Sequence, residues 1–224
     1  MSNPTDLYAA ARDRLIAELR VLDEVEAGAP VPTCPGWSVS DVVAHVSGLV
    51  ADLLAGVQPP LGTDEMTARQ VGERRGMTLG EICDEWANNA DGIADYFEGR
   101  EVYALGLTAD LAVHTHDIAE AIDSVSPPPI EATLAGCERY VPLLQERAAK
   151  ACDIALTITL DGEATAPTEG SAPLHLQTTP TDFLRSVTGR RTRSQVEALD
   201  WEGDPARLLD DAFTQYGPFR PEGD

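Results

Sequence analysis

Residues 104–122 read ALGLTADLAVHTHDIAEAI, and this stretch is the part of the sequence that best indicates fold and function. At about 100° per residue, a helix would place several of its apolar side chains on one stripe together with Asp110, His114 and Asp117. Asp110 and His114 are four residues apart, so both side chains point the same way. Because carboxylates are seldom buried without a partner or a metal, the pattern predicts a ligand pair on a buried helix face. His116 would point away from that face.

A third candidate ligand, His45, lies on a second predicted helix. Ser38 and Asp41 have the spacing of a capping box, with Asp replacing the usual Glu, so a helix should begin there. Val42, His45 and Leu49 would then share one apolar face, which is the face expected to pack against other helices.

The side chains of His45, Asp110 and His114 together match the two-histidine-plus-carboxylate set of hydrolytic zinc sites, which bundles build from facing helices. We therefore predict that these three residues are metal ligands. The alternative is a buried histidine that is hydrogen-bonded to a carboxylate with no metal. The metal itself stays open, because zinc, nickel, cobalt and iron all accept imidazole and carboxylate.

The first part of the chain is predicted to be an antiparallel four-helix bundle. A polar stretch over residues 58–77 is a candidate mobile flap that could hold a short helix. Three consecutive prolines at 127–129 interrupt the helical pattern, and we place the domain boundary near them, between residues 125 and 126. Apolar periodicity, capping boxes and glycines place the four bundle helices at about 4–26, 39–55, 79–99 and 104–122.

The second part, residues 126–224, is predicted to be a small α+β domain. A helix over 131–151 should be bent or split by Pro142. The alternating strand 154–160 ends at Asp161-Gly162, a hairpin signal, and Leu174 and Leu176 mark another strand. Two further helices should run from Thr179 to Gly189 and from Asp204 to near Gly217.

Composition narrows the range of partners. The chain has 224 residues, 43% of them hydrophobic, and a formal net charge of −22, which argues against a nucleic-acid or anionic-membrane surface as partner. No amino-terminal leader and no long apolar run is evident, so we expect a cytoplasmic protein. Lys150 is the one lysine among sixteen basic residues, a coding habit of genomes rich in G and C.

The four cysteines never form C-x-x-C, so neither a zinc knuckle nor a redox dithiol is indicated. Most should be buried, although Cys34 could be a reactive thiol. A chain with so few cysteines suits a reducing compartment. The sequence has no Gly-rich phosphate loop, no G-x-S-x-G and no H-E-x-x-H motif, which removes several common enzyme classes.

Residues 33–45, TCPGWSVSDVVAH, resemble the signature of the mycothiol-dependent maleylpyruvate isomerase family. The resemblance implies a DinB-like bundle, a sterol-carrier-like carboxy-terminal domain, mycothiol as co-substrate and an actinobacterial source. It also implies a divalent metal, usually zinc, bound by the histidine of this segment and a later carboxylate-x-x-x-His pair. That pattern falls on His45, Asp110 and His114, with Asp117 supporting the ligands. The family carboxylate is Glu, so Asp110 is one methylene shorter.

A basic cluster stands out from the acidic background: Arg185, Arg190, Arg191 and Arg193. It could complement a helix end and form surface ion pairs, or it could capture an anion with planar guanidinium donors. The family resemblance implies one arginine near the active site, which leaves Arg190, Arg191 and Arg193 as candidates for substrate or thiol binding.

The resulting functional prediction is a metal-dependent enzyme in which the mycothiol thiolate adds to a small electrophilic molecule, as isomerase or thiol transferase. One alternative is a hydrolase whose metal activates water. Another is a non-catalytic protein that binds a metal or ligand on the same bundle. The expected partners are small molecules, with neither nucleic acid nor membrane among them.

Overall fold

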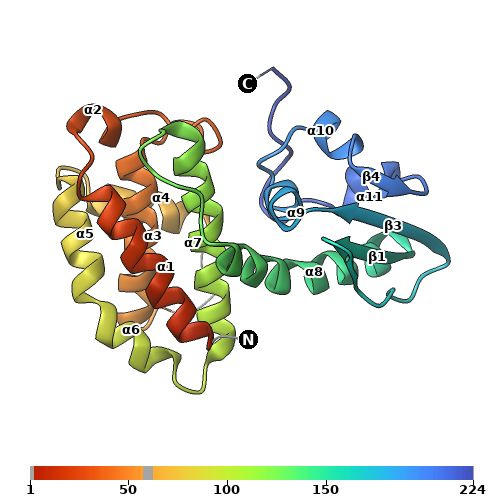
Figure 1. Cartoon of the computed structure of the whole chain (residues 1–224), viewed down its shortest axis with the longest axis horizontal. Helices are drawn as coiled ribbons and strands as arrows, with labels where there is room; N and C mark the ends of the chain where they lie inside the picture. The colour runs from red at the N-terminus through yellow and green to blue at the C-terminus, as the bar shows by residue number, and fades with distance from the viewer. Residues whose placement is uncertain (1–2, 58–62, 224) are drawn as a thin grey trace. The chain divides into compact units, whose positions relative to one another are not determined.

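The computed structural model describes residues 3–57 and 63–223 (Figure 1). The chain forms two compact units, which divide between Ala132 and Thr133. The first is helical, and the second contains a four-stranded sheet with helices. The predicted α+β class, with a helical bundle before a small mixed domain, is therefore confirmed. The boundary expected between residues 125 and 126 lies shortly before the division that the structure shows.

Four helical segments form the bundle of the first unit, with α1 packed on α7 and α5, and α3 packed on α5 and α7. Tyr8, Trp86 and Phe97 fill the space between them and are all buried. The indole nitrogen of Trp86 donates a hydrogen bond of 3.0 Å to the Tyr8 hydroxyl, so the polar ends of both rings are satisfied. The bundle helices are α1 (Pro4–Leu19), α3 (Val39–Leu54), α5 (Leu79–Asn88) continued by α6 (Ala90–Phe97), and α7 (Glu101–Ala121).

Helix starts follow the capping signals, whereas two of the predicted helices are too long. The capping boxes that begin at Ser38 and Thr78 are both present. The helix predicted over 4–26 is interrupted, because Asp23 forms its own capping box and begins the short helix α2 (Glu24–Ala27). The helix predicted over 79–99 breaks at Asn89, a residue type that competes for backbone hydrogen bonds.

Part of the predicted flap is a packed helix. Helix α4 (Asp64–Glu73) lies against α3, and its side chains Gln70 and Val71 are buried. Residues 58–62, which belong to the same predicted stretch, lie outside the described residues. The described part of this stretch is therefore an integral piece of the first unit.

The sheet of the second unit has the strand order β2-β1-β3-β4. Strands β1 and β3 are parallel, and the other two pairs are antiparallel. The hairpin predicted at Asp161-Gly162 is present, with positive φ angles of 48° and 91° at these residues. The strands are β1 (Ile154–Leu160), β2 (Glu163–Ala164), β3 (Ala172–Thr178) and β4 (Asp200–Glu202).

The helices of the second unit differ from expectation at three points. Helix α8 (Ile130–Cys152) continues through Pro142 as one element, so of the predicted bend or split the split does not occur. Helix α9 (Pro180–Val187), in contrast, agrees with expectation, because it begins at the predicted Thr179 cap. Helix α11 (Ala206–Asp211) ends well before Gly217, and the short α10 (Arg193–Glu197) was not predicted.

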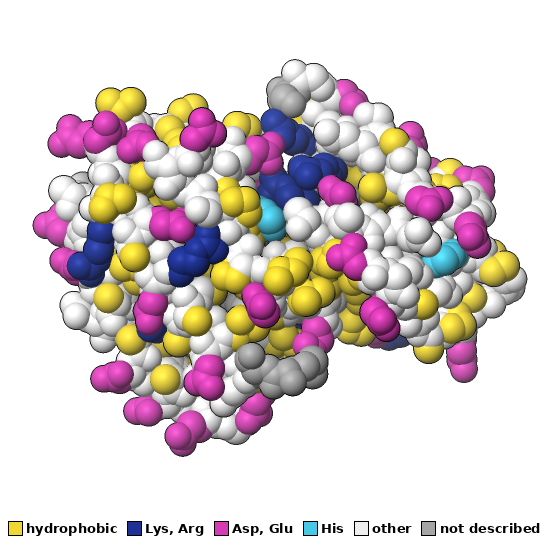
Figure 2. Space-filling view, in the orientation of Figure 1, with side chains coloured by type: hydrophobic (Ala, Val, Ile, Leu, Met, Phe, Trp, Pro, Cys, Tyr) yellow, Lys and Arg dark blue, Asp and Glu magenta, His cyan; other side chains and the backbone are white. Residues whose placement is uncertain are grey.

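Acidic side chains are spread over the face of the molecule drawn in Figure 2, in keeping with the net charge of −22. Among the described residues, every helix is too short or too polar to cross a lipid bilayer.

Candidate metal centre

Helices α3 and α7 bring His45, Asp110 and His114 together, as the sequence predicts. One ligand atom from each of the three residues lies within 4.8 Å of the other two. His45 Nε2 is 4.0 Å from Asp110 Oδ2, and His114 Nε2 is 3.7 Å from Asp110 Oδ1. The two imidazole rings lie nearly perpendicular, with centroids 5.1 Å apart. The helical spacing of Asp110 and His114 therefore directs both side chains to His45.

The carboxylate of Asp110 contains an oxygen that the protein leaves unsatisfied. Asp110 Oδ2 is buried and has no hydrogen-bond partner among the described residues. The side chains of the two histidines are only 5% and 7% exposed. A buried carboxylate oxygen without a donor costs free energy, and a cation would remove that cost. The site is thus built to receive positive charge.

The three side chains fit a divalent metal. Metal bonds of about 2.0–2.2 Å in tetrahedral geometry place neighbouring ligand atoms about 3.4 Å apart. The observed separations of 4.0 and 3.7 Å need only small side-chain movements to reach that value. Asp110 reaches the site although its side chain is shorter than Glu. Three protein ligands would leave a fourth position for a small molecule.

Behind His45, a buried hydrogen-bond chain runs through α4. His45 Nδ1 lies 2.7 Å from Gln70 Oε1, and Gln70 Nε2 donates to Asp52 Oδ2. Arg69 in turn donates to both oxygens of Asp52, at 2.8 and 2.7 Å. The imidazole of His45 is therefore held from behind by α4.

Behind His114 lies Asp117, the residue that the family resemblance implies as support for the ligands. Asp117 Oδ2 is 3.2 Å from His114 Nδ1, an ion-pair contact that is off-axis for a hydrogen bond. Burial lowers the pKa of His114, but the charge of Asp110 and the contact with Asp117 outweigh burial and raise this pKa to about 10. The surroundings of His114 therefore favour positive charge.

Asp117 also fastens the loop that carries the TCPGW motif. It accepts a hydrogen bond of 2.8 Å from Thr33 Oγ1 and one of 3.5 Å from Cys34 Sγ. Cys34, His114 and Asp117 thereby form a second group whose ligand atoms are close together. Cys34 is half-buried, whereas the other three cysteines are buried.

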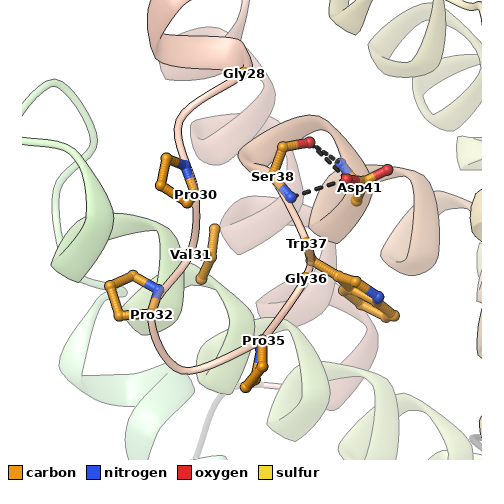
Figure 3. Close-up of a pocket in the computed structure, with 9 residues that line it drawn as sticks. All are labelled: Gly28, Pro30, Val31, Pro32, Pro35, Gly36, Trp37, Ser38 and Asp41. Atoms are coloured by element: carbon orange, nitrogen blue, oxygen red, sulfur yellow. Dashed lines mark hydrogen bonds between the residues drawn. The ribbon is translucent and has the colours of Figure 1, made fainter. Parts of the chain in front are cut away.

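The same loop turns at Pro35-Gly36, where the amide of Trp37 donates to the carbonyl of Cys34 and Gly36 has a φ of 83°. Pro followed by a glycine with positive φ is the pattern of a type II turn. Trp37 then lies beside His45, with ring centroids 5.5 Å apart. A hollow of about 450 Å³ on this loop is lined by residues such as Trp37 and Asp41 but by none of the three ligand residues (Figure 3).

The remaining predicted residues are His116, in the first unit, and the arginines of the second unit. His116 is buried on α7 but belongs to neither group of potential ligands found among the described residues. Arg190 donates to the carbonyl of Thr188. Arg191 lies 3.5 Å from Asp182, and Arg193 forms ion pairs with acidic residues of α10 and α11. These contacts within the second unit agree with the ion-pair interpretation of the cluster.

Sequence reasoning missed Gln70, Asp52 and Arg69. One signal was available, because Asp52 follows His45 by seven residues and so shares its helix face. A second acid on an apolar face predicts a polar partner. Nothing in the local pattern identified Gln70 as that partner, since α4 is a separate element.

The fold and the site define a class of protein: a helical bundle with two histidines and a carboxylate on facing helices, followed by a small mixed domain. A sequence model described as the mycothiol maleylpyruvate isomerase N-terminal domain matches residues 8–100. Residues 8–100 of the chain are therefore similar to the N-terminal domain of the mycothiol maleylpyruvate isomerase family, as the TCPGW segment predicted.

Comparison with solved structures supports the fold over most of the chain. The crystal structure of the mycothiol-dependent maleylpyruvate isomerase matches with a TM-score of 0.58, and a histidine-to-alanine mutant structure of that enzyme with 0.55. Each has 10% sequence identity and covers 84% of this chain and 88% of its own. Among curated protein sequences, none matches the chain significantly.

Proposed function

We propose that this protein is a metal-dependent enzyme that uses mycothiol to isomerise a small electrophilic molecule or to transfer the thiol to it. The observation that carries the proposal is the His45, Asp110 and His114 cluster with its unsatisfied carboxylate oxygen, in a chain that holds this family's N-terminal domain. Zinc is the metal we propose, because imidazole and carboxylate are among its common ligands. We place the reaction in the cytoplasm, because a chain with so few cysteines suits a reducing compartment.

A divalent metal at this site would supply a Lewis acid that keeps a coordinated thiol deprotonated. The residues of the chain supply the rest. His45 and His114 would offer nitrogen donors, and a metal would displace the proton that the surroundings of His114 favour. Asp110 contributes negative charge from the more exposed side of the cluster, with 27% of its side chain accessible. Asp117 restrains His114 from behind. The protein needs no cysteine of its own to provide the nucleophile.

The test uses full-length protein purified without a histidine tag. We expect close to one divalent metal per chain by elemental analysis, and metal-dependent consumption of maleylpyruvate only when mycothiol is present. Turnover without thiol would instead indicate a hydrolase, and metal binding without turnover a non-catalytic protein. Less than about a tenth of an equivalent of metal after zinc reconstitution would refute the metal centre.

Arg190, Arg191 and Arg193 are proposed to orient an anionic group of substrate or thiol. Replacing all three by Gln should leave metal content unchanged and lower kcat/KM roughly ten- to a hundred-fold, since a charge-assisted hydrogen bond contributes about 1.5 to 3 kcal/mol. Arg207→Gln, at an exposed position of α11, serves as the control. A triple variant with full activity would show that the cluster forms ion pairs only.

A further inference from the structure

Gln70 of α4 links His45 to a fixed charge, the carboxylate of Asp52. It is fully buried, with 0% of its surface exposed. Its amide oxygen lies 2.7 Å from His45 Nδ1, and its amide nitrogen lies 2.5 Å from Asp52 Oδ2. A buried glutamine with both ends of its amide engaged is restricted to one orientation.

That orientation determines which nitrogen of His45 carries the proton toward α4. The carboxylate of Asp52 can only accept, so the NH₂ group of Gln70 must face it and the carbonyl oxygen must face His45. His45 Nδ1 must then donate its proton to Gln70. Nε2, on the other side of the ring, is directed toward Asp110.

Asp52 is itself immobilised, so the orientation does not depend on a mobile group. Its side chain is 7% exposed and accepts two hydrogen bonds from Arg69. Arg69 also pairs with Glu73 at 3.0 Å. The groups along this chain of hydrogen bonds are therefore the guanidinium of Arg69, the carboxylate of Asp52, the amide of Gln70 and the imidazole of His45.

A glycine in α3, Gly48, leaves the space in which α4 packs against α3. A Cβ atom at Gly48 would lie 2.7 Å from Gln70 Cβ and 2.8 Å from Arg74 Nη1, both closer than real Cβ contacts. Arg74 donates to the carbonyl of Gln70 and forms two hydrogen bonds of 2.7 Å with Glu85. Gly48 and Arg74 thus hold Gln70 at His45.

We propose that Gln70 is a positioning residue that fixes the tautomer and orientation of His45, and that α4 is thereby part of the metal centre. The effect on metal affinity rests on the proposed function, whereas the effect on the His45 proton does not. Partners of this kind behind a ligating histidine typically change metal affinity ten- to a hundred-fold when removed.

The first experiment measures zinc affinity of full-length protein by competition with a chelator. Gln70→Leu keeps the approximate size of the side chain but removes the acceptor, and we expect the dissociation constant to rise ten- to a hundred-fold. Thermal unfolding of the metal-free variant shows whether it remains folded. A folded Gln70→Leu variant with the wild-type dissociation constant would overturn the proposal.

A charge exchange provides the matched rescue. Gln70→Glu alone would place two carboxylates in contact, because Asp52 lies 2.5 Å from the Gln70 amide. The Gln70→Glu/Asp52→Asn double variant keeps an acceptor toward His45 and a donor between the two residues, at the same net charge. We expect it to recover most of the zinc affinity that Gln70→Glu loses. Equal losses in the single and double variants would contradict the proposed hydrogen-bond order.

The His45 proton can be observed directly in metal-free protein. Spectra of ¹⁵N-histidine-labelled wild type should show a hydrogen-bonded Nδ1 proton on His45, absent in Gln70→Leu and present in the double variant. No such proton in the wild type would overturn the inference, even if zinc binds. Failure of zinc to bind while this proton is present would refute the metal centre and leave the role of Gln70 intact.

A glycine pair tests the contribution of α4 packing. Gly48→Ala should displace Gln70 and weaken zinc binding at least tenfold, because its Cβ has no room. Gly72→Ala on α4 meets nothing within 4 Å and should leave zinc affinity unchanged. Wild-type affinity in Gly48→Ala would show that α4 is not part of the metal centre.

Discussion

His114→Ala is expected to weaken zinc binding roughly 50- to 1000-fold. Structural zinc sites bind their metal with about 10 to 16 kcal/mol, so one of four ligands accounts for about 2.5 to 4 kcal/mol, and each 1.4 kcal/mol is tenfold in affinity. His114 is well placed for this test, because its two ring nitrogens lie 3.7 Å from Asp110 and 3.2 Å from Asp117. The measurement is a competition titration with a chelator on metal-free protein.

His116→Ala is the matched control, since it removes the same side chain from the same helix two residues away. His116 belongs to neither group of potential ligands among the described residues, so zinc affinity should stay within about twofold of the wild type. If His116→Ala loses the metal and His114→Ala retains it, the assignment of the ligand face of α7 is wrong.

The parts of the site that could be predicted from sequence are those encoded within single helices. The period of residues 104–122 placed Asp110, His114 and Asp117 on one face, and the Ser38 capping box fixed the start of the helix that carries His45. Both kinds of signal are local, because helix geometry relates residues a few positions apart. The contact between the two helices then followed from their apolar faces.

Other features depend on contacts between elements, and the local sequence pattern gives little or no signal for them. Gln70 lies on a helix whose stretch reads as a polar flap, and its burial becomes evident only once α4 is packed at Gly48. The short helix α2 was hidden because the apolar period of α1 continues across the Asp23 cap. Strand β4 has only three residues and pairs with β3 from a distant part of the sequence, which no periodicity can reveal.

Asp117 contacts both the TCPGW loop and His114, so we expect its replacement to have a large effect on folding. Its carboxylate is 0% exposed, and Asp117→Ala would remove the acceptor of Thr33 and Cys34 and leave the His114 contact uncompensated. Breaking a buried charged pair from one side typically costs about 3 to 5 kcal/mol. We expect a loss of this size in the free energy of unfolding of metal-free protein, measured by denaturant titration.

Asp117→Ala should also remove the hydrogen bond that holds the Cys34 thiol. The reactivity of this thiol therefore reports on the loop separately from global stability. Cys34 is half-buried and the other three cysteines are buried, so the first thiol to react with an aromatic disulfide reagent reports on this loop. Under native conditions Asp117→Ala should label faster than the wild type, whereas Asp123→Ala, at an exposed position after α7, should not. Unchanged labelling together with unchanged stability would mean that Asp117 does not hold the loop. Faster labelling with an unchanged zinc affinity would confine its role to the loop, because the contact with His114 would then contribute nothing to the metal centre.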